Sequence, residues 1–292
     1  MVGKVCLVTG ATSGIGKEAS FQLARRGATL VLVGRDQAKC ETSVLEIKEQ
    51  TGNPGVEYLL ADLSQQSQVR DLAEAFKKRH GQLHVLLNNA GLIFLSQRWT
   101  ADGIEMTFGL NHLGYFLLTF LMLDTLKASA PARIVNVSSD AHRRAALDLD
   151  DLQSLHRYQG FGAYSRSKLA NIYFTYEIAR RLEGTGVTVN ALHPGLVATN
   201  FLSNNGFRGK FLRVFLAAKG ISIPRGADTA VYLASSLEVE GVTGQYFVKR
   251  SAVDSSVVSY DKDVGLGLWQ ASLGLTGLED ITPGPENQAD GI

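Results

Sequence analysis

Residues 5–16 read Val5-Cys6-Leu7-Val8-Thr9-Gly10-Ala11-Thr12-Ser13-Gly14-Ile15-Gly16, an apolar run that leads into a glycine-rich turn. A helix is expected from about Gly14 to Arg26, where Gly27 ends it. Backbone N–H groups at such a helix start have no partner within the helix, and the helix dipole adds positive potential, so the turn suits an anion. Gly10 permits the tight turn, and Gly14 and Gly16 allow close approach of a pyrophosphate and of the helix. The segment predicts a phosphate-binding strand–turn–helix unit, although the spacing is one residue longer than the common dinucleotide fingerprint and a plain turn remains the alternative.

Outward from this unit, strands and helices alternate along the chain. Strands are expected at 30–33, 56–60, 84–87, 133–137 and 187–192. Helices are expected after the strand at 30–33, ending near 50, and at about 102–127 and 162–182, while Val69, Leu72, Ala73 and Phe76 have the spacing of one face of another helix. This alternation predicts an α/β, doubly wound Rossmann fold with a mostly parallel seven-stranded sheet and helices on both faces. Residues 1–250 are expected to form one catalytic domain, in which 140–162 is an irregular polar insertion and 200–222 a small substrate lobe. Residues 251–292 would be a partly flexible C-terminal extension.

Composition excludes several other classes of protein. The 292 residues are 45% apolar and 20% charged, as in a globular protein with a full core, and the net charge of +1 gives no electrostatic case for nucleic acid. Cys6 and Cys40 are too few for a disulfide framework. The apolar run from Leu113 to Leu123 is shorter than the ~20 residues of a membrane span. With no signal peptide recognised, a cytoplasmic protein is expected.

The end of the second strand predicts which dinucleotide binds. A site for NAD usually places an acidic residue there, but this chain has Gly34 followed by Arg35. Arg35 can form two hydrogen bonds to a 2′-phosphate, and Lys17 could add charge; both could instead be solvated surface cations. We therefore expect a preference for NADP(H), and Gly34→Asp should shift it toward NAD.

Tyr164 and Lys168 stand four residues apart on an expected helix and so lie on one face. A neighbouring ammonium favours the phenolate, which would lower the tyrosine pKa and make Tyr164 a usable acid and base. Ser138 and Ser139 close the strand at 133–137, at the carboxyl end of the sheet, where ligands of such folds bind. A serine there could bond a substrate oxygen, or could simply form a turn.

Together these motifs resemble the short-chain dehydrogenase/reductase superfamily over about residues 3–250. The matching residues, in family order, are Thr9 to Gly16, Asp62-Leu63, Asn88-Asn89-Ala90-Gly91, Asn111, Ser139, Tyr164 with Lys168, and Pro194-Gly195. The runs Val33 to Asp36, Leu110 to Gly114, Val135 to His142, Tyr164 to Asn171 and His193 to Gly195, with the long separation of Ser139 from Tyr164, look closer to the retinol dehydrogenase branch.

The resemblance implies the following roles. Tyr164 is the general acid/base, Lys168 lowers its pKa and binds the nicotinamide ribose, and Ser139 polarises the substrate oxygen. Asn111 would hold a water in a proton relay to Lys168. The cofactor would be contacted by Gly10, Thr12, Ser13, Gly14, Ile15, Gly16, Arg35, Asp62, Leu63, Asn89, Ala90, Gly91, Tyr164, Lys168, Pro194, Gly195, Val197 and Thr199.

The remaining features favour plain structural interpretations. His112 and His142 lack metal-ligand spacing, so no metal is expected, and Asp148, Asp150 and Asp151 suit a solvated loop. The apolar 200–222 segment favours a lid over a lipophilic pocket rather than a membrane-surface helix. We expect an NADP(H)-dependent enzyme that interconverts a lipophilic alcohol with its aldehyde or ketone; a retinoid-specific enzyme and a non-catalytic NADP-binding sensor are the alternatives. The resemblance also implies a homodimer or homotetramer.

Overall fold

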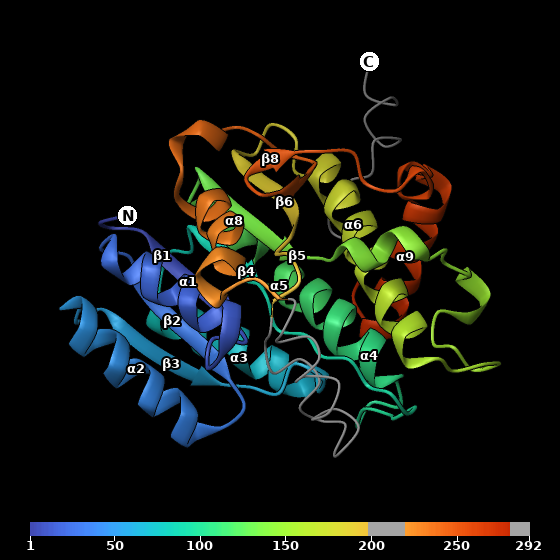
Figure 1. The fold of residues 1–292 in the computed structure, drawn as a ribbon, viewed down its shortest axis with the longest axis horizontal. Coiled ribbons are helices and arrows are strands. Elements are labelled where there is room, and N and C mark those ends of the chain that lie inside the picture. The colour runs from blue at the N-terminus through green and yellow to red at the C-terminus, as the bar shows by residue number, and fades with distance from the viewer. Residues whose placement is uncertain (198–219, 281–292) are drawn as a thin grey trace.

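The computed structural model describes residues 1–197 and 220–280. At its centre lies one eight-stranded sheet in the order β3-β2-β1-β4-β5-β6-β7-β8 (Figure 1). The strands are β1 (Val5–Thr9), β2 (Thr29–Gly34), β3 (Val56–Leu60), β4 (Val85–Asn88), β5 (Ala132–Val137), β6 (Val187–His193), β7 (Gln245–Val248) and β8 (Ser251–Ala252). All neighbours pair in parallel except β8, which turns back against β7. The predicted Rossmann fold is therefore confirmed, with the two-residue β8 added to the seven strands expected.

Helices cover both faces of the sheet. Successive strand residues point to opposite faces, so Cys6 and Val8 pack under α1 (Gly14–Arg25), α2 (Gln37–Thr51) and α8 (Ile223–Ser235). Leu7 packs on the other face under α3 (Gln66–Arg79), α5 (Gly114–Ala128) and α6 (Gly160–Arg181). The short helical turns are η2 (Asp140–Arg144), η3 (Leu149–Asp151), η5 (Leu237–Val239) and η6 (Val257–Tyr260). Both free thiols, of Cys6 and Cys40, are buried.

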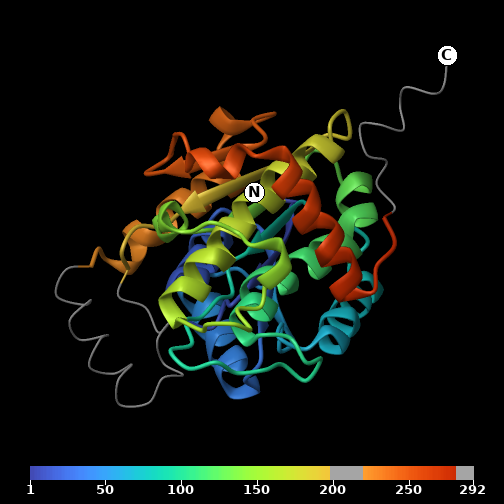
Figure 2. The ribbon, with the colours of Figure 1, turned by 90° about the vertical axis from the view of Figure 1, so that its right-hand side faces the viewer.

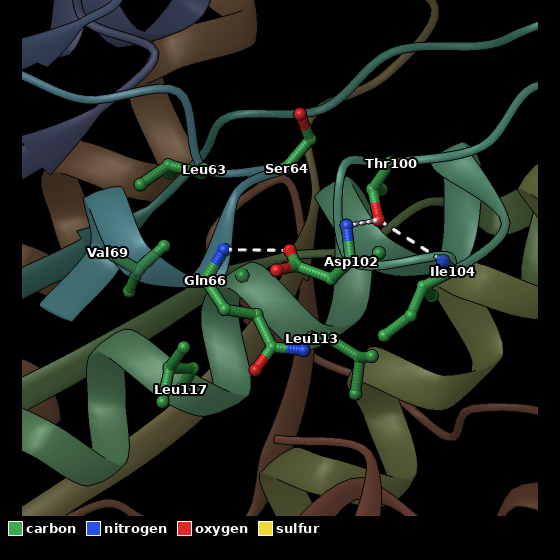
Figure 3. A pocket seen from close by; sticks show the side chains of 11 residues that line it. Leu63, Ser64, Gln66, Val69, Thr100, Asp102, Ile104, Leu113 and Leu117 are labelled. Atoms are coloured by element: carbon green, nitrogen blue, oxygen red, sulfur yellow. Dashed lines mark hydrogen bonds between the residues drawn. The ribbon is translucent and has the colours of Figure 1, made fainter. Parts of the chain in front are cut away.

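The helix expected at 102–127 is interrupted by a wider turn. It consists of α4 (Met106–Phe108), the π-helical turn η1 (Gly109–Leu113) and α5. Glycines flank the π turn where the backbone is crowded: a Cβ on Gly109 would lie 2.9 Å from Thr100 Cγ2, and one on Gly114 would lie 2.8 Å from the Leu63 carbonyl oxygen. Figure 3 shows the small pocket between these segments, where Asp102 accepts a hydrogen bond from the first N–H of α3. Its volume of about 10 Å³ is at the lower limit for one water molecule.

Met106–Ala128 has the length and apolar composition of a membrane-spanning helix, which the shorter apolar run in the sequence did not suggest. Within the fold, however, 89% of its apolar window is buried. The helix carries apolar residues on all sides because the sheet, α3 and α6 surround it, as in the core helix of a layered fold.

A further helix, α9 (Lys262–Thr276), lies beyond the last strand expected from the sequence. It packs along α6, as both views show (Figure 2). Trp269 of α9 is buried against α5 and α6, with the Arg181 guanidinium 4.2 Å from its ring centre. Residues 200–219 of the predicted substrate lobe fall outside the described residues.

Candidate active site

A cleft of about 1080 Å³ opens at the carboxyl ends of the parallel strands. Most of the predicted site residues meet there: Gly10, Thr12, Ser13, Gly14, Ile15, Arg35, Asp62, Leu63, Asn89, Ala90, Gly91, Ser139, Tyr164, Lys168, Pro194, Gly195 and Val197. Of the predicted residues that the structure describes, Gly16 and Asn111 lie behind this lining rather than in it. Thr199 lies outside the described residues.

The glycine-rich turn is fastened to the end of β4. Asn89 Nδ2 donates to the Thr9 carbonyl oxygen (2.9 Å), and Thr9 Oγ1 accepts from the Asn89 N–H (2.8 Å). Gly10 has a positive φ of 63°, which only glycine adopts cheaply. A Cβ on Gly16 would lie 2.4 Å from both Asn89 Nδ2 and the Gly10 carbonyl oxygen. Gly16 therefore acts from behind the cleft, by letting α1 approach the turn.

The far end of the cleft carries two cations. Arg35 is 54% exposed, with Nη1 3.7 Å from Asp62 Oδ2, and Lys39 lines the cleft beside it. The sequence analysis missed Lys39, although it stands four residues after Arg35 in the first turn of α2. Lys17, suggested there instead, pairs with Glu46 across α1 and α2.

Gly34 cannot easily carry a side chain. A Cβ at this position would lie 2.7 Å from both Cys40 Sγ and Thr12 Cγ2. An acidic residue at the end of β2 would thus require the packing between β2, α2 and the glycine-rich turn to move.

Tyr164 and Lys168 project from the same face of α6. Tyr164 is partly open to the cleft, whereas Lys168 is only 3% exposed. Lys168 Nζ donates to the Val137 carbonyl oxygen (2.9 Å) at the end of β5 and lies 5.7 Å from the centre of the Tyr164 ring. It also lies 5.6 Å from the ring centre of Tyr115, a buried neighbour that sequence reasoning did not single out.

The electrostatics of this pair differ from the sequence-based expectation. Burial raises the pKa of Tyr164, and a hydrogen bond with the Ser139 hydroxyl acts in the opposite direction. Burial also lowers the pKa of Lys168 to about 7. The expected lowering of the tyrosine pKa by a neighbouring ammonium was wrong for the protein alone, because desolvation disfavours the charged form of both groups.

Ser139 is the first residue of a tight turn that continues into η2. Its Oγ accepts a hydrogen bond from the Ala141 N–H (3.2 Å). Ser138 is turned away, and its hydroxyl donates to the Lys168 carbonyl oxygen (2.7 Å). The two neighbouring serines therefore differ: the Ser138 hydroxyl is bonded to α6, and only the Ser139 hydroxyl acts on the pKa of Tyr164.

Asn111 lies in the π turn and supports the wall of the cleft. Its side-chain amide accepts from the Leu92 N–H and donates to the Leu92 carbonyl oxygen, both at 2.9 Å. Its own carbonyl oxygen accepts from Asn171 Nδ2 (2.9 Å). A Cβ on Gly91 would be 3.2 Å from Asn111 Oδ1 and 3.3 Å from Lys168 Nζ, so these three residues are in close contact. Wider turns of this kind are frequent at functional sites.

Apolar side chains line the rest of the cleft near Ser139 and Tyr164. Phe161, one turn before Tyr164 on α6, is 50% exposed. The apolar lining residues in this part of the cleft are Leu92, Ile93, Val137, Ala141, Phe161, Leu196 and Val197. Sequence reasoning did not find this wall, because its members come from four separate segments of the chain.

Comparisons with known proteins agree with this architecture. Residues 4–207 match the family model for short chain dehydrogenase. The chain is 42% identical to retinol dehydrogenase 12 of Mus musculus, with 95% of this chain and 87% of that protein covered. It is 41% identical to polyprenol dehydrogenase of Homo sapiens, with 96% and 87% covered. Among solved structures, the RhlG/NADP active-site complex of Pseudomonas aeruginosa superimposes with a TM-score of 0.68 at 25% identity, covering 85% of this chain and 94% of that one.

Proposed function

Because this chain belongs to the short-chain dehydrogenase family and is an oxidoreductase acting on CH–OH groups, we propose that it interconverts a lipophilic alcohol with its aldehyde or ketone, using NADP(H). One observation carries the proposal. Ser139, which follows β5, meets Tyr164 and Lys168 of α6 in one cleft with the glycine-rich turn and an apolar wall.

The chemical roles follow from the contacts of each residue. NADP(H) supplies the hydride when bound. Ser139 and Tyr164 would both hydrogen-bond the substrate oxygen, since both residues line the same cleft. The raised pKa of Tyr164 keeps its proton in place at neutral pH, so in the reducing direction Tyr164 donates that proton to the oxygen. Lys168, whose pKa of about 7 lies near neutrality, is suited to pass a proton on to Tyr164.

Asn111 would serve that transfer by holding the Gly91-Leu92 backbone against Lys168. Its carbonyl oxygen already accepts one hydrogen bond from Asn171 and has a second lone pair for a bridging water. We propose that Asn111 holds a water there, the role that the family resemblance implies.

The residues present fit a phosphorylated dinucleotide. The cradle around Gly10 and Gly16 has no space for side chains, as a backbone that approaches a pyrophosphate requires. Arg35 and Lys39 supply positive charge where a 2′-phosphate would lie, and the crowding at Gly34 opposes an acidic residue there. The NADP complex named among the similar structures supports the same cofactor.

The substrate class is inferred from the apolar wall. Two relatives of nearly equal identity are named for retinol and for polyprenol, both long apolar alcohols. That near-equality favours a lipophilic substrate in general over a retinoid in particular.

The decisive experiment follows NADPH absorbance with a panel of carbonyls: retinal, polyprenal, medium-chain aldehydes, quinones and steroid ketones. We expect turnover of a lipophilic member and a loss of at least ~100-fold in kcat for Tyr164→Phe. Tyr176→Phe is the matched control, because Tyr176 lies on the same helix and its hydroxyl bonds Ser255 instead. Tight NADPH binding without turnover of any member would favour the non-catalytic sensor.

The preference for NADPH over NADH can be tested separately. Arg35→Ala and Lys39→Ala should weaken NADPH binding, measured by fluorescence titration, and leave NADH binding nearly unchanged. Gly34→Asp must be compared with Gly34→Ala, since both introduce the clash with Cys40 and only the first adds the carboxylate. Equal loss of NADPH and NADH in the arginine and lysine variants would contradict the proposed phosphate contact.

We also propose a domain organisation, a class of partner and a location for the protein. Residues 1–250 would act as one catalytic domain, with a lobe at 200–222 over the cleft. A small lipophilic molecule would be the partner, without nucleic acid or metal, in the cytoplasm and in a homodimer or homotetramer. Peripheral membrane contact through the lobe remains the less favoured alternative, and liposome flotation tests it.

A further inference from the structure

Two histidine side chains contact the peptide group between Ser139 and Asp140. Neither has a role in the reaction proposed above. His142 lies in η2, three residues after Ser139, and His193 is the last residue of β6. Each makes a hydrogen bond with the backbone of the Ser139 turn through a ring nitrogen.

The backbone partners fix the tautomer of each ring. The Asp140 N–H donates to His193 Nδ1 (3.2 Å), so Nδ1 carries no proton and Nε2 does. The opposite holds for His142, whose Nδ1–H donates to the Ser139 carbonyl oxygen (2.7 Å) and whose Nε2 accepts from the Ser256 N–H (3.0 Å). Both rings are thus neutral, and they hold the two sides of the Ser139–Asp140 peptide group.

We infer that His193 is a positioning residue for Ser139, and that it holds the serine turn only as the neutral Nε2–H tautomer. This inference rests on the proposed function, in which Ser139 bonds the substrate oxygen. The turn sets the direction of Ser139 Oγ, since that atom also accepts from the Ala141 N–H within the same turn. Loss of the anchor at Asp140 would therefore move the hydroxyl away from Tyr164.

Protonation of His193 would place an N–H at Nδ1, directly facing the Asp140 N–H. Two donors cannot bond one another, so the anchor would break. The groups around the ring act in opposite senses: the Asp140 carboxylate, 3.7 Å from Nε2, favours the charged ring, and Arg143 opposes it. From β7, Tyr246 Oη donates to Asp140 Oδ1 (3.0 Å) and holds that carboxylate in place. Burial is the largest influence and lowers the pKa of His193, which favours the neutral ring.

His142 holds the other side of the turn, and its protonation would also break a hydrogen bond. Burial lowers the pKa of His142, and its ring packs edge-on against Tyr246 at 5.0 Å between centroids. Its protonation would set a new N–H against the Ser256 N–H, which displaces η6 rather than Asp140. The two anchors can therefore be separated by measuring the Asp140 amide alone.

The test uses His193→Asn and His193→Leu. The asparagine places an amide oxygen close to the position of Nδ1 and does not titrate, whereas leucine has a similar size and no acceptor. His84→Leu is the matched control, because His84 Nδ1 likewise accepts a backbone N–H, from Val5 (3.1 Å), at the opposite end of the sheet. Hydrogen exchange of peptides that contain Asp140, in the protein without cofactor, reports the anchor independently of activity.

We expect His193→Leu to speed exchange at Asp140 by at least ~10-fold and to lower kcat by ~10–100-fold, with the Kd for NADPH changed less than 3-fold. His193→Asn should restore most of the protection and of kcat. It should also lose the acid-dependent acceleration of exchange that the wild type shows below the usual histidine range, after correction for intrinsic rates. His84→Leu should lower stability and leave exchange at Asp140 unchanged.

Unchanged protection in His193→Leu would overturn the inference, as would lost protection with unchanged kcat. An identical acid dependence in His193→Asn and wild type would overturn the role of the tautomer. A wild type that turns over no carbonyl, but shows the expected exchange pattern, would count against the proposed function and not against the anchor.

Discussion

Replacement of Lys168 by methionine should stabilise the free protein near pH 7 and lose that advantage as the pH rises. The ammonium is buried, and burial lowers its pKa from the ordinary 10.5 to about 7. At ~1.4 kcal/mol per pH unit, that interval corresponds to ~5 kcal/mol of unfavourable free energy when the folded protein carries the charge. The penalty is complete below pH ~7, where Lys168 is charged in both states, and falls to zero as pH rises toward 10.5, because the unfolded chain there binds more protons than the folded one.

The assay is urea unfolding of wild type and Lys168→Met, without cofactor, between pH 7 and 9.5. Over this window the stability of the wild type should rise relative to the variant by ~3 kcal/mol. Loss of the hydrogen bond to Val137 costs the variant ~1–3 kcal/mol at every pH, so only the pH-dependent part reports the charge. A stability difference that stays constant over this range would show that Lys168 is not desolvated, and the account of its near-neutral pKa would fail.

Three further variants test other parts of the structure. Gly16→Ala forces a Cβ to within 2.4 Å of Asn89 Nδ2, so fluorescence titration should show NADPH binding weakened by at least ~10-fold; unchanged binding would refute the close approach of α1. Tyr115→Phe should raise the unfolding free energy by ~1 kcal/mol, because the Tyr115 hydroxyl is buried with no hydrogen-bond partner among the described residues; a thermal melt that shows destabilisation would reveal a hidden partner. Arg181→Leu should cost ~1.5–3 kcal/mol in denaturant unfolding, because the buried Glu177 carboxylate loses the guanidinium 2.7 Å away and keeps only its pair with Arg180; a neutral result would mean that Arg180 compensates the charge fully.

Much of the sheet could be predicted because buried parallel strands read as uninterrupted apolar runs. The expected strand 56–60 coincides with β3. The observed β5 begins at Ala132, one residue before the strand expected at 133–137. The glycine-rich turn and the four-residue spacing of Tyr164 and Lys168 located two parts of the cleft, because turn chemistry and helix periodicity are local properties of the chain.

What escaped prediction depends on contacts between distant segments. Helix α9 contains Gly265, Gly267 and Gly274, which lower helix propensity. It forms through contacts with distant segments, and Gly267 allows one of them, since a Cβ there would be 2.5 Å from Leu149 Cδ1. The π turn likewise depends on the approach of Thr100 to Gly109. The raised pKa of Tyr164 could not be read from its spacing to Lys168, since burial decides the direction and burial is a property of the assembled cleft.

The crowding at Gly34 also constrains how this enzyme could acquire a different cofactor preference. A carboxylate at the end of β2 would arrive in a position already filled by Cys40 and Thr12. A mutant with that change alone would lose folding stability, and this loss would outweigh any gain from a preference for NAD. The order of substitutions therefore matters: smaller residues at positions 12 and 40 must come first, and only then does an acid at position 34 become accessible to selection.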